Sequence, residues 1–142
     1  MKLLLLSLFL LTFSACESKT STKKTTYERN KAYGIPWEKD LDSAFEKAKE
    51  EKKILIVMAV SDNCQWCEKM KKNTLSNPKV AKQLKKYVLV MADRETEEER
   101  NQFPPFEHVP IIFFMTHEKE IIDDLRGYFE AEDFLEYLND LG

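Results

Sequence analysis

The sequence has no Arg-rich stretch and no basic segment interleaved with aromatic residues. Its 22 Lys and Arg residues are outnumbered by 25 Asp and Glu residues, which gives a net charge of −3 at pH 7. This balance argues against nucleic acid as the main partner, because phosphate binding needs a basic patch. The sequence also has no internal repeat, and 142 residues supply one hydrophobic core but hardly two. A single folded domain is therefore expected.

The sequence has no apolar run long enough to cross a membrane. The longest one, almost unbroken, extends from Leu3 to Phe13, whereas a membrane-spanning helix needs about 20 apolar residues. Lys2 precedes this run and the small residues Ser14 and Ala15 follow it, which is the pattern of a cleaved signal peptide over residues 1–15. The mature protein is therefore predicted to lie outside the cytoplasm.

The residue that follows the signal peptide is a cysteine, Cys16, and a polar tract comes after it. This arrangement resembles a bacterial lipoprotein signal, in which the cysteine is lipidated and becomes the mature N-terminus; Phe13 stands where that family usually has leucine. The alternative is an ordinary secretory signal that happens to end near a cysteine. Residues 16–32 are predicted to be the lipidated cysteine and a flexible tether, because residues 17–32 are rich in Ser, Thr and Lys. The folded domain is placed at 33–142.

Cysteine and histidine are also scarce. If Cys16 carries lipid, only Cys64 and Cys67 of the three cysteines remain in the domain. They can be a redox couple, half of a metal site, or two ordinary core thiols. A structural zinc site usually has four Cys or His ligands, and only His108 and His117 are available to complete one. Loop histidines without a special role are the alternative interpretation of both.

Helical and strand patterns alternate along residues 33–142. Leu41, Ala44, Phe45 and Ala48 have the spacing of one helical face, which predicts a helix over 40–52. Residues 54–60 are continuously apolar, as in a strand that is covered on both faces of an α/β sheet. The other predicted elements are helices at 64–75, 79–86 and 130–141, strands at 87–91, 111–115 and 120–125, and an exposed acidic helix or loop at 93–102.

The two cysteines lie at the predicted junction of a buried strand and a helix. Residues 61–63 are Ser, Asp and Asn, which predict a turn with candidate N-caps before the helix. At a helix start, unpaired N–H groups and the helix dipole favour an anion, so Cys64 is expected to be the nucleophile. Cys67 lies one turn later and deeper, and is expected to resolve a mixed disulfide formed at Cys64. Trp66 is interpreted as part of the substrate-facing surface, with a hydrophobic plug as the alternative.

The buried strand, the motif Cys64-Gln65-Trp66-Cys67 and the dipeptide Val109-Pro110 before another apolar strand resemble the thioredoxin superfamily. Bacterial envelope members with a CxWC motif are the most similar. The resemblance implies a three-layer α/β sandwich with a mixed central sheet flanked by helices. It also implies that Pro110 is cis and lies against the active-site disulfide, and that the backbone of Val109 pairs with bound substrate.

The sequence departs from this family at one position. The family often buries a carboxylate six residues before the first cysteine to shuttle protons, but that position holds Met58. Proton relay through Asp62, Glu68 or water is left open. Four aromatic residues are interpreted as core or edge packing: Tyr33, Trp37, Phe103 and Phe106. The segment 103–106, Phe-Pro-Pro-Phe, is interpreted as a rigid loop that leads to Val109 and Pro110.

The resemblance and the residues together predict an extracytoplasmic, membrane-tethered thiol-disulfide oxidoreductase that acts on protein thiols or disulfides. No dissociable cofactor is expected, because the dithiol itself carries two electrons, and a redox partner must recharge it. Oxidase, reductase and isomerase remain open, with reductase favoured by family likeness. The competing hypothesis is a non-catalytic module on the same fold that binds copper, zinc or a client protein.

Overall fold

The computed structural model describes residues 32–142. The elements in chain order are the 3-10 turn η1 (Ala32–Gly34), helix α2 (Leu41–Glu51), strand β1 (Leu55–Val60), helix α3 (Gln65–Lys69), the π-helix η2 (Met70–Leu75), helix α4 (Pro78–Leu84), strand β2 (Val88–Asp93), helix α5 (Glu97–Arg100), strands β3 (Ile111–Met115) and β4 (Ile121–Arg126), and helix α6 (Ala131–Leu141). The signal peptide, Cys16 and nearly all of the predicted tether lie outside the described residues.

The four strands form one mixed sheet in the order β2-β1-β3-β4. Strand β1 pairs in parallel with β2 and antiparallel with β3, and β3 pairs antiparallel with β4. Every residue of β1, β2 and β3 is buried, which accounts for their continuously apolar sequences: both faces of these strands are covered by helices. The strand predicted at 54–60, with cover on both faces, is confirmed.

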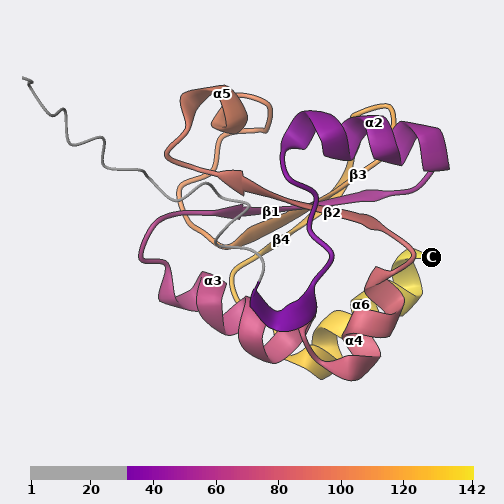
Figure 1. Cartoon of the computed structure of the whole chain (residues 1–142). Coiled ribbons are helices and arrows are strands. Elements are labelled where there is room, and N and C mark those ends of the chain that lie inside the picture. The colour runs from indigo at the N-terminus through magenta and orange to yellow at the C-terminus, as the bar shows by residue number, and fades with distance from the viewer. Residues whose placement is uncertain (1–31) are drawn as a thin grey trace, which may run out of the picture.

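Side chains alternate along each strand, so the sheet separates two apolar clusters. On one face, Leu55, Val57 and Ala59 of β1 pack with α2. On the other face, Ile56 and Met58 pack with η2, α4 and α6. Figure 1 shows α2 and α5 above the sheet and α3, α4 and α6 below it. The three-layer α/β architecture predicted from the sequence is therefore confirmed.

Strand β4 is the exception in the sheet. It lies at an edge, and all six of its residues are exposed or half-buried, including Ile121 and Ile122 at 37% and 45% exposure. The edge position is not the cause, because β2 lies at the other edge and is buried throughout. The side chains of β4 have less cover, so the polar residues Asp123, Asp124 and Arg126 lie there at little cost. The sequence of β4 thus differs from that of the other three strands because its side chains remain in contact with solvent.

Helix boundaries shift from the predicted ones for identifiable reasons. Asp40 caps α2 by accepting the N–H of Ser43 at 2.8 Å. Asn77 caps α4 in the same way, with Pro78 as its first residue, so this helix begins before the predicted position 79 and ends at Leu84. The predicted helix 64–75 is one continuous helical segment, but its second half, η2, winds as a π-helix.

Two expectations for single residues are wrong. None of the residues at 61–63 caps α3; the cap is Cys64 itself, whose sulfur accepts the N–H of Cys67. Tyr33 does not pack in the core: it is 40% exposed, with a positive φ of 73° in the turn η1. Trp37 and Phe103 are buried and Phe106 packs against the α2-side cluster, as expected. Among the described helices, none has the length and apolar character to span a membrane.

Candidate active site

The turn after β1 brings the two predicted cysteines together. Asn63 takes the left-handed conformation, with φ at 58°, which asparagine tolerates better than most residues. Cys64 follows as the cap of α3, and its Sγ accepts the N–H of Cys67 at 3.1 Å. The two sulfurs form a disulfide, and the Cα atoms lie 5.2 Å apart. The first helical turn therefore closes to disulfide distance, and the pair forms the disulfide that the resemblance implied.

The two cysteines differ in their access to solvent. Cys67 is 3% exposed and belongs to the apolar cluster that also holds Met58 and Met70, whereas Cys64 is only partly buried. A partner molecule can therefore approach Cys64, while Cys67 is protected by the core. This agrees with the expectation that Cys67 lies deeper.

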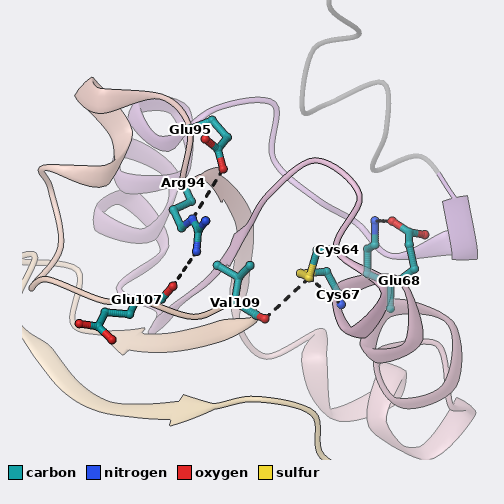
Figure 2. Close-up of a disulfide and its surroundings, with 8 residues drawn as sticks. Cys64, Cys67, Glu68, Arg94, Glu95, Glu107 and Val109 are labelled. Atoms are coloured by element: carbon teal, nitrogen blue, oxygen red, sulfur yellow. Dashed lines mark hydrogen bonds and ion pairs between the residues drawn. A yellow bond between two sulfur atoms is a disulfide. The ribbon is translucent and has the colours of Figure 1, made fainter.

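The cis-proline segment lies directly against Cys64. The peptide bond between Val109 and Pro110 is cis, as the resemblance implied. The carbonyl oxygen of Val109 lies 3.8 Å from the Sγ of Cys64 (Figure 2). A disulfide sulfur has no hydrogen to donate, but a Cys64 thiol at this position can donate to that oxygen. Residues 45 positions apart in the sequence thus form one site.

Arg94 holds the loop that leads to Val109. Its Nη1 donates to the carbonyl oxygen of Glu107 at 2.6 Å, its Nε lies 3.6 Å from a carboxylate oxygen of Glu95, and its backbone N–H donates to Val60 at the end of β1. Figure 2 shows this guanidinium between Glu95 and Glu107. Sequence reasoning missed Arg94, because nothing local distinguishes it from any other arginine in an acidic segment.

The surroundings of Cys67 contain an apolar side chain where the family often buries a carboxylate. Met58 is fully buried in the same cluster as Cys67. Of the two side chains left open as proton relays beside water, Glu68 pairs with the ammonium of Lys71, and Asp62 is exposed. Lys71 is itself 5% exposed, whereas the Glu68 side chain is 58% exposed, so the pair joins a buried ammonium to a carboxylate at the surface where α3 meets η2. Sequence reasoning did not single out this buried lysine.

The two histidines lie at opposite ends of β3. His108 precedes this strand on the loop near Cys64, whereas His117 follows it in the turn to β4. Because Ala59 pairs with Ile111 and Leu55 with Met115, His117 is at the far end of the sheet from the cysteines. Within residues 32–142 there is no group of three or more His, Cys, Asp or Glu side chains placed to hold a metal ion.

Comparison with known proteins defines the family. Residues 36–116 match the model of a thioredoxin-like family. The chain belongs to this family. No curated protein matches the sequence, so the solved structures are the relatives that bear on the fold. The predicted resemblance to the thioredoxin superfamily is confirmed.

The similar solved structures are thioredoxin-fold proteins of low sequence identity. A thioredoxin from Thermus thermophilus has a TM-score of 0.60 and 22% identity, covering 70% of this chain and 82% of its own. The oxidised C-terminal domain of DsbD from Neisseria meningitidis has a TM-score of 0.57 and 20% identity, covering 70% and 90%. A DsbH oxidoreductase has a TM-score of 0.59 and 18% identity, covering 75% and 83%.

The fold and the cysteine pair are those of a thiol-disulfide oxidoreductase. The family model spans the strand β1, the Cys64–Cys67 pair and the cis-proline segment. The pair is at disulfide distance, with one sulfur accessible and the other in the core. Exchange between a protein dithiol and a client disulfide requires an accessible attacking sulfur, and Cys64 can supply it.

Proposed function

We propose that this protein reduces disulfide bonds in client proteins outside the cytoplasm, using Cys64 and Cys67. The observation that carries the proposal is the unequal burial of a joined cysteine pair: Cys64 is reachable at the start of α3 and Cys67 is 3% exposed behind it. A thiolate at Cys64 gains the N–H of Cys67 as a hydrogen-bond donor. That donor and the helix start favour the ionised, reactive form.

The reaction is two thiol-disulfide exchanges. In the reduced enzyme, the Cys64 thiolate attacks one sulfur of the client disulfide; a mixed disulfide forms, and the other client sulfur leaves as a thiolate that takes a proton. The Cys67 thiolate then attacks the Sγ of Cys64, which breaks the mixed disulfide and releases the second client thiol. The client gains two electrons and two protons, and the enzyme is left with the Cys64–Cys67 disulfide. A dithiol partner must reduce it again.

Three residues beside the disulfide are proposed to bind the client: Trp66, Val109 and Pro110. The backbone of Val109 lies beside the Cys64 sulfur, with a carbonyl oxygen 3.8 Å away, so an extended client segment can pair with it while Pro110 shapes the floor of the groove. Trp66 is 55% exposed between the cysteines. A large exposed aromatic ring at a site of this kind favours contact with a partner surface.

The proposed location depends on residues outside the described part of the chain. The apolar run of residues 3–13, the small residues after it and Cys16 support a lipoprotein signal and a tether over residues 16–32. The domain would then be anchored to the bacterial envelope and face the periplasm or the exterior. Mass analysis of the mature N-terminus tests this: a diacylglyceryl-modified Cys16 is expected, and an unmodified Cys16 removes the anchor from the proposal.

The activity is tested by two measurements on the purified domain. The first is insulin reduction with dithiothreitol as electron donor, and the second is the potential of the Cys64–Cys67 couple against glutathione. We expect reduction of insulin and a potential near that of thioredoxin, about −270 mV. A potential near −120 mV, as in a strong oxidant, would overturn the proposed direction. Stoichiometric copper or zinc binding without any exchange would favour the binding module instead.

A further inference from the structure

The loop between β4 and α6 is fixed beside the cis-proline segment. The N–H of Gly127 donates to the carbonyl oxygen of Pro110 at 2.8 Å. Two residues later, the carbonyl oxygen of Phe129 accepts the hydroxyl of Thr74 at 2.5 Å, which ties the same loop to η2. Tyr128 lies between these two anchors. Its ring lies beside that of Trp66, the residue before Cys67, although Tyr128 is more than 60 residues from the cysteines in sequence.

Tyr128 and Trp66 together hold one lysine ammonium. The two ring centroids lie 5.7 Å apart, and the Nζ of Lys69 lies 4.9 Å from the Trp66 centroid and 4.3 Å from the Tyr128 centroid. Both distances are within the range of a cation–π interaction. The Lys69 side chain is therefore held in one region rather than spread over many rotamers, and a partner would lose less conformational entropy by binding it.

The Lys69 charge is not neutralised within residues 32–142. No ion pair or hydrogen bond engages its ammonium there, whereas its neighbour Lys71 pairs with Glu68. The carboxylate of Glu130 accepts the hydroxyl of Tyr128 at 2.9 Å. An ammonium that is positioned but unpaired is free to bind a carboxylate from another molecule.

The other side of Cys64 has the opposite charge. Residues 93–108 contain six acidic residues and two arginines, a net charge of −4 with His108 neutral. Figure 2 shows Glu95 and Glu107 on the opposite side of Cys64 from Glu68. A client bound at Cys64 would therefore meet the Lys69 ammonium on the α3 side and the carboxylates of Glu95 and Glu107 on the other, which discriminates between client orientations and between client charges.

We propose that Lys69, positioned by Trp66 and Tyr128, selects client segments that carry an acidic side chain beside the cysteine attacked by Cys64. This inference rests on the proposed function and names the client class of the same site. The exchange chemistry is unchanged: the client disulfide is reduced and Cys64–Cys67 is oxidised. The carboxylate of the client pairs with the Lys69 ammonium while the mixed disulfide forms. Lys69 is thus a specificity-determining residue and touches no reacting sulfur.

The test uses three synthetic peptides, each closed by one disulfide and identical except for Glu, Gln or Lys beside the first cysteine. The measurement is kcat/KM for their reduction by the wild-type domain at low salt. We expect the Glu peptide to be reduced about fivefold faster than the Lys peptide, the scale of one exposed ion pair. The ratio should fall towards one at 1 M salt, because screening shortens the range of surface charge interactions to about 3 Å.

Charge variants test whether the preference for the Glu peptide depends on Lys69. Lys69→Glu should invert the Glu-to-Lys peptide ratio, and Lys69→Gln should bring it near one. The ratio within each variant cancels any change common to all peptides. The matched control is Lys72→Glu, which makes the same charge change on an exposed lysine of η2 that contacts neither ring. It should leave the wild-type ratio nearly unchanged.

The outcomes distinguish a failure of the client preference from a failure of the proposed function. A wild-type ratio near one, with the Gln peptide still reduced, overturns the specificity and leaves the proposed function intact. An effect of Lys72→Glu equal to that of Lys69→Glu overturns the role of Lys69 and assigns the preference to overall charge. If no peptide is reduced by the wild-type domain, the proposed function itself fails and this inference fails with it.

Discussion

Two helices on opposite faces of the sheet begin in the same way. In α2 the carboxylate of Asp40 accepts the N–H of Ser43 at 2.8 Å, and in α3 the sulfur of Cys64 accepts the N–H of Cys67 at 3.1 Å. Each cap satisfies one of the N–H groups that a helix start leaves without a partner. The backbone geometry is thus shared, and only the capping atom differs.

That atom decides what each helix start does. The Asp40 carboxylate is already an anion, and it contributes helix stability and no chemistry. The Cys64 sulfur is an anion only when the disulfide is reduced and the thiol has lost its proton. The same kind of N–H donor therefore stabilises the reactive thiolate in α3. Helix capping in α2 and thiolate activation in α3 are therefore one physical effect with two consequences, and each can be changed without the other.

The largest effect is expected from Cys64→Ser. Serine also caps helices well, so the N-terminus of α3 should remain formed, but its hydroxyl is not ionised at neutral pH. Insulin reduction should fall by about a thousandfold or more, because the step that opens the client disulfide is lost. Stopped-flow or turbidity assays of insulin reduction provide the measurement.

The control for this variant is Cys67→Ser. It retains the nucleophile and loses only the second exchange, so it should accumulate a mixed disulfide with the client, visible as a covalent adduct by non-reducing electrophoresis. If Cys67→Ser forms no adduct while Cys64→Ser does, the assignment of nucleophile and resolving cysteine is reversed.

The Asp40 cap should show the complementary result. Asp40→Ala removes the acceptor for the Ser43 N–H and is expected to lower the free energy of unfolding by about 1 kcal/mol. Insulin reduction should change by less than about twofold, because α2 packs on the sheet face opposite to Cys67. Urea unfolding of the reduced domain, together with the insulin assay, checks both values. A parallel loss of activity would mean that the two helix starts are coupled.

The smallest effect is a pH dependence of the α2 cap. Hydrogen bonds from the hydroxyl and backbone N–H of Ser43, with a smaller contribution from Lys39, hold the pKa of Asp40 below its ordinary value. The folded state therefore favours the carboxylate, and its contribution is present above about pH 4, the ordinary Asp value. It is lost as the pH falls from there through the lowered pKa.

Asp40→Asn tests this sign. Asparagine keeps a capping oxygen but does not titrate. The difference in the free energy of unfolding between the wild type and Asp40→Asn should therefore shrink as the pH falls from 5 to 2, measured by urea unfolding at each pH. A difference that grows on acidification would contradict the lowered pKa.

Most of the fold was predictable because its signals are local. The burial of β1 on both faces follows from seven consecutive apolar residues at 54–60, and the α2 face follows from Leu41, Ala44, Phe45 and Ala48. Boundaries were less predictable: Asn77 and Pro78 start α4 earlier than expected, and η2 winds as a π-helix without a pattern that distinguishes it. Tyr33 was interpreted as core or edge packing because aromatic side chains usually pack, but it is 40% exposed in the turn η1.

The candidate site was predictable in its chemistry and not in its surroundings. The spacing of Cys64 and Cys67 after an apolar strand predicted the redox chemistry. The resemblance to a known family predicted that Val109 and Pro110 lie beside them. Arg94, Tyr128 and the burial of Lys71 had no comparable signal. Arg94 bonds to Glu107 and Tyr128 contacts Trp66, partners outside their own helices and strands. The spacing of Glu68 and Lys71 is local, but it does not show that Lys71 is buried.

By itself the sequence determined the cysteine pair, the order of helices and strands, and which strands are buried, because these depend on spacing and apolar periodicity within a few residues. Only the tertiary structure decided that the Val109 carbonyl lies beside the Cys64 sulfur, that Arg94 supports this loop, and that Trp66 and Tyr128 hold the Lys69 ammonium. Those contacts arise because the strand pairing brings the C-terminal ends of β1, β2 and β4 and the N-terminal end of β3 to the same end of the sheet. Such proximity depends on packing over the whole chain and leaves no local pattern in the sequence.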